Sequence, residues 1–243
     1  CTLEPGGERS MSIIEFKDVS HQDILHHVSG TFREGRITTF VGPSGAGKTT
    51  CLKHINGLLS PDTGTILFKG EDIAEMDILE LRKKIGMAFQ SAPMIQGTVY
   101  DNLNLPKAIF DETLDRDRAS ELLHRVDLSE ALLDQPVKSL SGGERSRVAI
   151  ARTLVNKPDV LLLDEITASL DYRTVKEIER LIRKLQQSYG VTVIWITHDL
   201  DQARRVSDDM WFLKDGELLA FGDASFIDES DNPVIQRFVR GED

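Results

Sequence analysis

The sequence contains few cysteines and no long apolar run, and both absences limit what it can be. Its two cysteines, Cys1 and Cys51, cannot form a disulfide framework and have no metal-site spacing, so a reducing cytoplasm fits best. The longest apolar stretches, Val160–Leu163 and Val191–Ile196, have strand length, far below the roughly 20 residues that a membrane-spanning helix needs. The N-terminus lacks the basic-then-apolar pattern of a secretory signal. Any association with a membrane must therefore come through a partner.

An excess of positive charge is also missing. The formal net charge is −11 and the pI is about 5.1, whereas general nucleic-acid binding favours a basic surface, so we expect no nucleic-acid partner. With 243 residues, 40% of them hydrophobic, the chain can bury a substantial core. This length suits one large α/β domain, or a core with a modest insertion, and leaves no room for a second full-sized domain.

Residues 1–10 differ from the rest of the chain. They show no periodicity and contain Pro5, Gly6 and Gly7, so we expect them to be disordered. By the genetic code, Gly6-Gly7-Glu8 can be written as a purine-rich ribosome-binding sequence just ahead of Met11. We therefore interpret Met11 as the natural start and residues 1–10 as translated leader. The mature N-terminal sequence from the native host would test this interpretation.

The order of strand and helix patterns indicates an α/β fold. Ile37–Val41 predicts a short strand, followed by a glycine-rich turn and a helix over Thr49–Leu59. The alternating segment Thr65–Phe68 predicts a strand in a small antiparallel sheet, and Ile85–Gln90 predicts another short strand. Further on, Val160–Leu163 and Val191–Thr197 are apolar strands separated by a helical stripe. Strand–helix–strand with fully apolar strands indicates a parallel sheet covered on both faces.

Between these strands the pattern becomes helical. Ala119, Leu122, Leu123 and Val126 recur at helical spacing, so we predict a helical insertion over residues 91–157. The core then comprises residues 11–90 and 158–225, and residues 226–243 form a C-terminal tail. Two strand-like runs split by Asp215-Gly216 predict a hairpin near the end of the core; they are Met210–Leu213 and Glu217–Phe221.

A complete phosphate-binding loop follows the first core strand. Glycines let backbone N–H groups curl around a polyphosphate, and the following helix offers its positive N-terminal end. We expect Lys48 to reach the β- and γ-phosphates and the Thr49 hydroxyl to ligate Mg²⁺. A glycine-rich turn with a surface lysine is the alternative. The predicted nucleotide-binding residues are Gly42, Pro43, Ser44, Gly45, Ala46, Gly47, Lys48, Thr49 and the next residue, Thr50.

Two carboxylates follow the strand Val160–Leu163. In a parallel sheet, this strand end lies beside the phosphate loop. Asp164 is placed to hold Mg²⁺, directly or through water, and Glu165 could polarise the attacking water as a general base. Four apolar residues followed by Asp-Glu are also common at structural strand ends, so the interpretation depends on the phosphate loop.

Leu140-Ser141-Gly142-Gly143-Glu144 precedes a predicted helix over Arg145–Leu154. Ser141 is a candidate N-cap, and Gly142 and Gly143 leave backbone N–H groups exposed to an anion, although the pattern alone could mark only a helix start. The segment resembles the signature motif of ABC ATPases. In the order of that family, Gln90 resembles the Q-loop glutamine and Thr197-His198-Asp199 the switch-histidine region. Ala168-Ser169-Leu170-Asp171 resembles the D-loop.

The resemblance covers roughly Ser12 to Asp223 and implies a fold, an activity and partners. The implied fold is a P-loop NTPase: a RecA-like parallel-sheet core with a small antiparallel β region and an inserted α-helical subdomain. The implied activity is ATP hydrolysis with Mg²⁺, coupled to transport by a separate integral membrane permease at the cytoplasmic face of the cell membrane. In this family two copies close head-to-tail as a homodimer, with each ATP between the phosphate loop of one copy and the signature motif of the other.

Roles for individual residues follow from the same resemblance. Ser141, Gly142 and Gly143 should contact the γ-phosphate bound to the opposite copy. His198 should hydrogen-bond that γ-phosphate and the attacking water, and Gln90 should sense Mg²⁺ and the γ-phosphate. A structural histidine at a strand end and a capping glutamine are the alternatives for these two residues.

The sequence departs from the family pattern in places. For the residue that stacks on adenine, the candidate is His21, with a solvated loop histidine as the alternative. Glu144 replaces the commoner glutamine, and Ile166 the usual proline, without removing a phosphate ligand. Two short segments resemble the Fet-type iron-efflux ATPases of bacteria and their plant relatives linked to aluminium tolerance; they are Leu163–Thr167 and Gly97–Leu103.

Part of the insertion is a candidate docking surface for the membrane subunit. Within Ser91–Asn104, the apolar candidates are Met94, Ile95, Val99 and Tyr100, with packing inside the insertion as the alternative for each.

Three other functions remain open. Phosphate- or amino-acid-importer ATPases share many of these features. ABC-type ATPases without a transport role carry long coiled coils, zinc-bearing insertions or tandem domains, which this chain has no room for. A phosphate-loop kinase would not need Ser141–Glu144 or His198.

Overall fold

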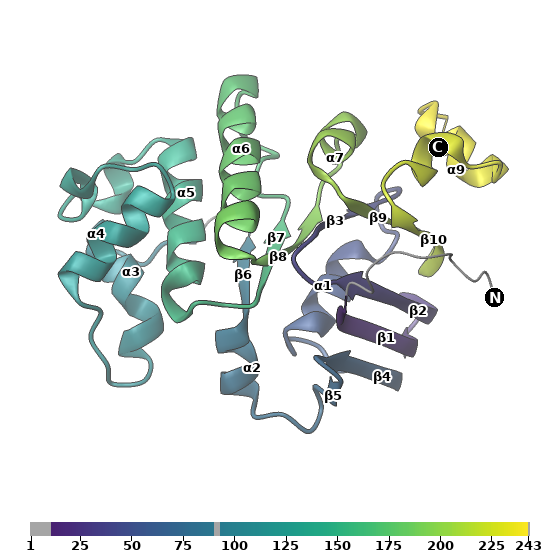
Figure 1. The fold of residues 1–243 in the computed structure, drawn as a ribbon, viewed down its shortest axis with the longest axis horizontal. Helices are drawn as coiled ribbons and strands as arrows, with labels where there is room; N and C mark the ends of the chain where they lie inside the picture. Colours follow the sequence, from purple (N-terminus) through teal and green to yellow (C-terminus); the bar gives the residue numbers. More distant parts are fainter. Residues whose placement is uncertain (1–10, 90–92, 243) are drawn as a thin grey trace.

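The computed structural model describes residues 11–89 and 93–242, which form two sheets and the helices around them (Figure 1). The larger sheet has the strand order β10-β9-β3-β8-β7-β6 and the smaller one β2-β1-β4-β5. The predicted leader, residues 1–10, and Gln90 lie outside the described residues. In chain order the elements are β1 (Ser12–His21), β2 (Leu25–Arg33), β3 (Ile37–Val41), α1 (Lys48–Ile55), β4 (Thr63–Phe68), β5 (Glu71–Asp72), α2 (Ile78–Lys84), β6 (Ile85–Phe89), α3 (Val99–Ala108), α4 (Arg116–Arg125), η1 (Glu130–Leu132), η2 (Val137–Ser139), α5 (Gly142–Thr153), η3 (Leu154–Asn156), β7 (Val160–Asp164), α6 (Tyr172–Tyr189), β8 (Thr192–Ile196), α7 (Leu200–Val206), β9 (Asp209–Lys214), β10 (Glu217–Asp223), α8 (Phe226–Glu229) and α9 (Pro233–Val239).

The larger sheet is parallel from β9 to β6, and its centre is buried on both faces, as the apolar strands predicted. Successive side chains of a strand point to opposite faces. In β7, Leu161 and Leu163 therefore belong to the cluster packed by α5 and α6, whereas Leu162 packs with Leu52 of α1 and the small sheet. Figure 1 shows α6 and α7 on one side of the strands and α1 on the other.

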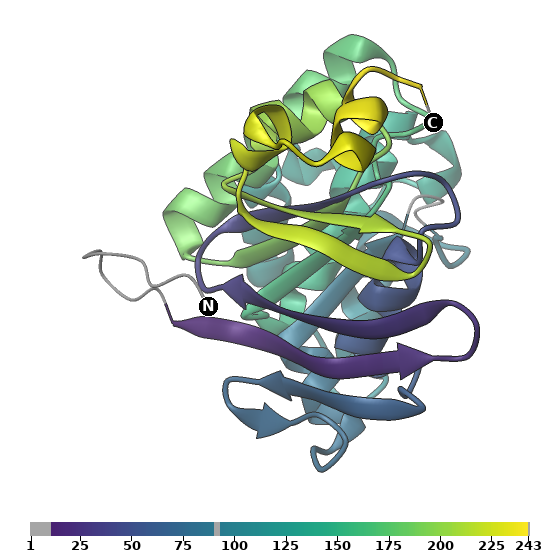
Figure 2. The same ribbon diagram turned by 90° about the vertical axis from the view of Figure 1, so that its right-hand side faces the viewer.

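The small sheet is antiparallel, as Thr65–Phe68 predicted, because β1 pairs with both β2 and β4. It is joined to the larger sheet by an aromatic cluster: Trp211 of β9 stacks on Phe32 of β2 at 4.1 Å between ring centroids, and Phe16 packs edge-on to both. A Cβ on Gly30 would lie 2.8 Å from the Trp211 ring, so only glycine leaves room for this contact. The predicted hairpin is β9–β10, which Figure 2 shows beside β2.

The stretch predicted to be helical contains α3, α4 and α5, drawn in teal at the left of Figure 1. Its predicted stripe, Ala119, Leu122, Leu123 and Val126, is fully buried. The segment after β10 also forms helices. Phe238 of α9 packs edge-on to Phe212 of β9 at 5.2 Å, so residues 226–239 cover the end of the larger sheet.

Helix α1 is shorter than the predicted Thr49–Leu59, because Gly57 adopts a left-handed φ of 65° and Leu58 N–H bonds back to the Lys53 carbonyl, a common helix end.

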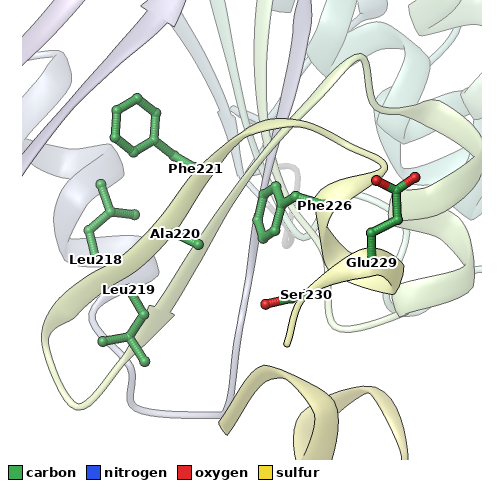
Figure 3. A pocket seen from close by; sticks show the side chains of 7 residues that line it. All are labelled: Leu218, Leu219, Ala220, Phe221, Phe226, Glu229 and Ser230. Carbon is green, nitrogen blue, oxygen red and sulfur yellow. The ribbon is translucent and has the colours of Figure 1, made fainter. Parts of the chain in front are cut away.

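Between β10 and α8 lies an open hollow of about 590 Å³, lined mainly by apolar side chains such as Phe221 and Phe226 (Figure 3). None of the predicted site residues lines it. Within 11–89 and 93–242, every helix is too short or too polar to cross a bilayer.

Candidate nucleotide-binding site

The phosphate loop connects β3 to α1 in a conformation that requires glycine at two positions. Gly42 has a φ of 137°, and a Cβ there would lie 1.9 Å from the Leu213 carbonyl oxygen. Gly47 has a φ of 96°, and its Cβ would lie 2.6 Å from a methyl group of Leu25. Both values lie in the region that favours glycine. The loop therefore turns tightly onto the N-terminus of α1, where the helix dipole favours an anion.

Lys48 lies folded across this loop. It is 5% exposed, and its Nζ donates hydrogen bonds to the carbonyl oxygens of Gly42 and Pro43, both at 2.7 Å. Burial lowers the pKa of Lys48, and the nearby Glu165 carboxylate offsets part of that effect. A buried ammonium whose partners are neutral carbonyls gains from an anionic ligand, which is the role predicted for Lys48.

Thr49 and Asp164 meet on one side of the loop. The Thr49 hydroxyl donates to Asp164 Oδ1 at 3.4 Å, although 115 residues separate them in the chain. Burial and the adjacent Glu165 carboxylate raise the pKa of Asp164. A hydroxyl and a partly buried carboxylate are hard oxygen ligands, and a divalent cation would compensate the buried negative charge, so the pair fits Mg²⁺.

Glu165 and His198 form a close pair at the ends of β7 and β8. His198 Nε2 lies 2.6 Å from Glu165 Oε1. Glu165 has a left-handed φ of 50°, and its N–H donates to the Ile196 carbonyl at 3.1 Å. The two side chains and the loop line one pocket of about 420 Å³, whose residues are Ile24, Ser44, Gly45, Ala46, Gly47, Lys48, Thr49, Thr50, Glu165 and His198.

The predicted second nucleotide-binding element lies elsewhere in the chain. Ser141 is the N-cap of α5, as predicted, and forms a capping box with Glu144: the Ser141 oxygen accepts from the Glu144 N–H at 3.3 Å, and the Glu144 carboxylate accepts from the Ser141 N–H at 2.8 Å. The Ser141 hydroxyl also donates to this carboxylate, at 2.8 Å. Gly142 and Gly143 begin the helix close to Leu170 and Thr174. None of these signature residues lines the pocket around the phosphate loop.

The prediction for His21 is wrong. The residue is 7% exposed, its ring packs edge-on to His54 at 4.6 Å between centroids, and it does not line the pocket around the phosphate loop, so it is not placed to stack on a base. Its position two residues after the buried Val19 in β1 puts it on the inner face of the strand, a signal that the sequence contained. Ile24, which is 38% exposed, also lines the pocket, and no motif in the sequence marks it.

The fold and this site together define a P-loop nucleoside triphosphatase, with a phosphate loop, a strand-end carboxylate pair and a parallel sheet behind them. The chain belongs to the ABC transporter family, because the family model of that description matches residues 25–168. It is therefore an ATP-hydrolysing subunit of the ABC type, and this family binds ATP with Mg²⁺.

Two curated relatives match nearly the whole chain. The protein YjkB of Bacillus subtilis (strain 168), described as an ABC transporter ATP-binding protein, is 38% identical over 93% of this chain and 90% of its own length. ABC transporter I family member 17 of Arabidopsis thaliana is 37% identical over 89% of this chain and 82% of its own length. Other relatives include ATP-binding proteins named for methionine import and choline transport.

Solved structures share the fold. The structure of cbiO1 from Clostridium perfringens, described as part of the ABC transporter complex cbiONQ, has a TM-score of 0.82 at 30% identity and covers 94% of this chain and 95% of its own. The ATP-binding cassette MJ0796 has a TM-score of 0.76 at 33% identity, covering 87% of this chain and 98% of its own. It was captured as a dimer in a post-hydrolysis state bound to ADP and Pi.

Proposed function

We propose that two copies of this chain close around two ATP molecules and thereby drive transport by a separate membrane subunit. The observation that carries this proposal is the separation within one chain of two half-sites: the phosphate loop lines one pocket, and the helix start at Ser141–Gly143 lies outside it. A second copy turned head-to-tail supplies the missing half. The dimeric state of MJ0796 supports this arrangement.

In the closed dimer the residues of one copy hold the phosphates and the water. Lys48 and the N–H groups from Ser44 to Thr50 bind the β- and γ-phosphates. Thr49 and Asp164 would hold Mg²⁺, with Gln90 as a further ligand, and a bound Mg²⁺ would supply positive charge against the negative charge that develops on the phosphates. Glu165 accepts a proton from the attacking water, and His198 orients Glu165 and contacts the γ-phosphate. Ser141, Gly142 and Gly143 of the other copy complete the phosphate contacts.

Hydrolysis then becomes movement of the two copies. While the triphosphate is present, its charge attracts groups from both copies, so the closed dimer is favoured. Phosphate release removes much of that attraction, and the copies separate. ATP binding and hydrolysis would therefore close and open the dimer in turn, and this motion would drive the membrane subunit.

A groove beside α3 suits the membrane subunit. It has a volume of about 630 Å³, and its exposed apolar side chains include Leu79, Ile95 and Ile109. Arg82, Lys83 and Arg152 add positive charge, which fits a short amphipathic helix with acidic residues. Of the four predicted docking residues, Met94 and Ile95 line the groove, whereas Val99 is fully buried and Tyr100 donates to the Leu114 carbonyl. Docking here places the chain at the cytoplasmic face of the membrane.

The transported substrate is proposed from the sequence segments Leu163–Thr167 and Gly97–Leu103, which resemble Fet-type iron-efflux ATPases. On that basis we propose metal export. The relatives named for methionine import and choline transport define the alternative, an importer-type ATPase. A deletion strain that accumulates iron supports export. A strain with normal iron content and reduced uptake of an organic solute supports import.

A trapped dimer tests the main proposal. Glu165→Gln removes the general base but keeps the side-chain volume, so the variant should bind ATP without hydrolysing it and elute as a dimer with ATP and Mg²⁺. Glu165→Gln combined with Ser141→Arg is the matched control. It should bind ATP and stay monomeric, because the arginine blocks the second half-site. If Glu165→Gln with ATP remains monomeric at high concentration, both alone and with the membrane subunit, the proposal is wrong.

A further inference from the structure

A buried amide lies behind the Glu165–His198 pair. Gln202 of α7 is 1% exposed and contacts three segments that are distant in the sequence. Its Oε1 accepts hydrogen bonds from the hydroxyls of Thr167 at 3.1 Å and Thr197 at 2.7 Å, and its Nε2 donates to Glu179 Oε1 at 3.2 Å. One side chain therefore joins the loops after β7 and β8 to helix α6.

The two threonines lie next to Glu165 and His198, the residues proposed to activate and orient the attacking water. Thr167 follows Glu165 by two positions, and Thr197 directly precedes His198. Both threonines are 7% exposed, so water does not readily replace their partner. The contact of 2.6 Å between Glu165 and His198 depends on how these two loops lie relative to each other, and both hydroxyls bond to the same oxygen.

The orientation of the amide is determined by its surroundings. Burial would raise the pKa of Glu179, but hydrogen bonds from Arg205, Lys176 and Gln202 lower it overall, so this residue is an ionised acceptor. Arg205 and Lys176 lie 2.9 and 3.0 Å from its oxygens. An ionised carboxylate only accepts, so the NH₂ group of Gln202 must face Glu179 and its oxygen must face the hydroxyls. An ionised glutamate in place of Gln202 could not donate to Glu179 and so could not satisfy both sides.

We propose that Gln202 is a positioning residue for ATP hydrolysis, whose amide holds the loop carrying Glu165 and the loop carrying His198 in the arrangement that aligns the attacking water. The inference rests on the roles proposed above for Glu165 and His198. Gln202 does not line the phosphate-loop pocket and acts only through the two threonines. Its hydrogen bond to Glu179 also connects the loops of Glu165 and His198 to α6, the helix that follows the segment resembling the D-loop.

The first test separates turnover from binding. Gln202→Leu replaces the amide with an apolar side chain of similar size and removes the acceptor shared by Thr167 and Thr197. The kcat should fall by about 10- to 100-fold, because small displacements of reacting groups have effects of that size. The Kd for ATP should not change, because Lys48 and the loop glycines are untouched. The matched control is Gln187→Leu on the exposed side of α6, which should retain the wild-type kcat.

The second test uses pH. Gln202→Glu places a carboxylate against Glu179 without a proton to share. Its kcat relative to wild type should rise as the pH is lowered and the new carboxyl gains a proton, which can bridge to Glu179 as the amide does. A residue with only a structural role would lower the Tm without changing the pH profile of folded protein. If Gln202→Leu does not fold, Thr167→Val removes one hydroxyl and should lower kcat several-fold.

The outcomes separate this inference from the proposed function. If Glu165→Gln hydrolyses ATP at the wild-type rate, the role of Glu165 is wrong and the proposal for Gln202 falls with it. If Glu165→Gln is inactive but folded Gln202→Leu, or Thr167→Val in its place, keeps the wild-type kcat, only the proposal for Gln202 is overturned. A wild-type pH profile for Gln202→Glu also overturns it.

Discussion

His198 Nε2 lies 2.6 Å from Glu165 Oε1, although the two residues follow different strands and are separated by 33 positions. The parallel pairing of β7 with β8 brings both strand ends to the same edge of the sheet, where the phosphate loop also lies. The geometry makes His198 a direct neighbour of the proposed general base. The contact therefore belongs to the fold of a single copy.

Removing this histidine should slow hydrolysis more than binding. We expect His198→Ala to lower kcat by about 100-fold, the size of effect typical for groups that assist proton transfer, with little change in the Kd for ATP. Steady-state turnover and equilibrium binding of a fluorescent ATP analogue measure the two quantities. His124→Ala, at an exposed position on α4, is the control and should behave as wild type. Equal loss of turnover in both variants would contradict the assignment.

Mixing two inactive variants should restore activity. Lys48→Ala damages the phosphate loop and Ser141→Arg the signature motif, so each homodimer lacks two working sites. A mixed dimer has one intact site, formed by Lys48 of one copy and Ser141 of the other. At equal amounts we expect about a quarter of the wild-type rate, since half of the dimers are mixed and each has one of two sites. A self-contained kinase-like site predicts instead that Ser141→Arg alone is fully active.

Two loop glycines should differ sharply when replaced by alanine. Gly42→Ala forces a Cβ onto the Leu213 carbonyl at a φ of 137°, and we expect a loss of roughly 3 kcal/mol in the free energy of unfolding. Gly45 has a φ of 80° but open space around it, so Gly45→Ala should cost only about 1 kcal/mol. Urea denaturation of both variants measures the difference. Similar losses for the two would mean that backbone conformation, and not the clash, dominates.

Neutralising Asp164 should stabilise the protein without ligands. Burial and Glu165 raise the pKa of Asp164, so the folded state holds its proton to higher pH than the unfolded state. The contribution of this group to stability is therefore greatest below the unfolded pKa and is lost as pH rises through the folded pKa. At pH 7 in EDTA, Asp164→Asn should raise the Tm, with less gain near pH 4. The same variant should lose Mg²⁺-dependent turnover. A lower Tm at pH 7 would contradict this account.

Local patterns in the sequence predicted much of the fold, because strand alternation, helical spacing and glycine-rich turns act over short distances. The antiparallel strand at Thr65–Phe68 and the buried stripe from Ala119 to Val126 are examples. The phosphate loop and the Asp164-Glu165 strand end were also predictable, since each needs particular residue types at fixed spacing.

Other features depend on contacts that the sequence does not display. The burial of His21 against His54 depends on the register of β1. The burial of Val99, for which the sequence left docking and internal packing open, depends on how the start of α3 packs. The amide of Gln202 meets Thr167 across 35 positions and Glu179 across 23, and no local pattern marks such a bond. Helix α1 ends early because Gly57 takes a left-handed conformation that the sequence alone allowed but did not require.

The capping box at α5 means that the proton of the Ser141 hydroxyl already has an acceptor. It bonds to the Glu144 carboxylate at 2.8 Å, and a hydroxyl has only one proton to give. The two bonds of the box do not use this proton: the Ser141 oxygen accepts from the Glu144 N–H at 3.3 Å, and the Glu144 carboxylate accepts from the Ser141 N–H at 2.8 Å. If a phosphate bound to the opposite copy accepts the hydroxyl proton, as the proposed dimer requires, both bonds of the box remain, so the first turn of α5 keeps its cap while the same serine contacts the nucleotide.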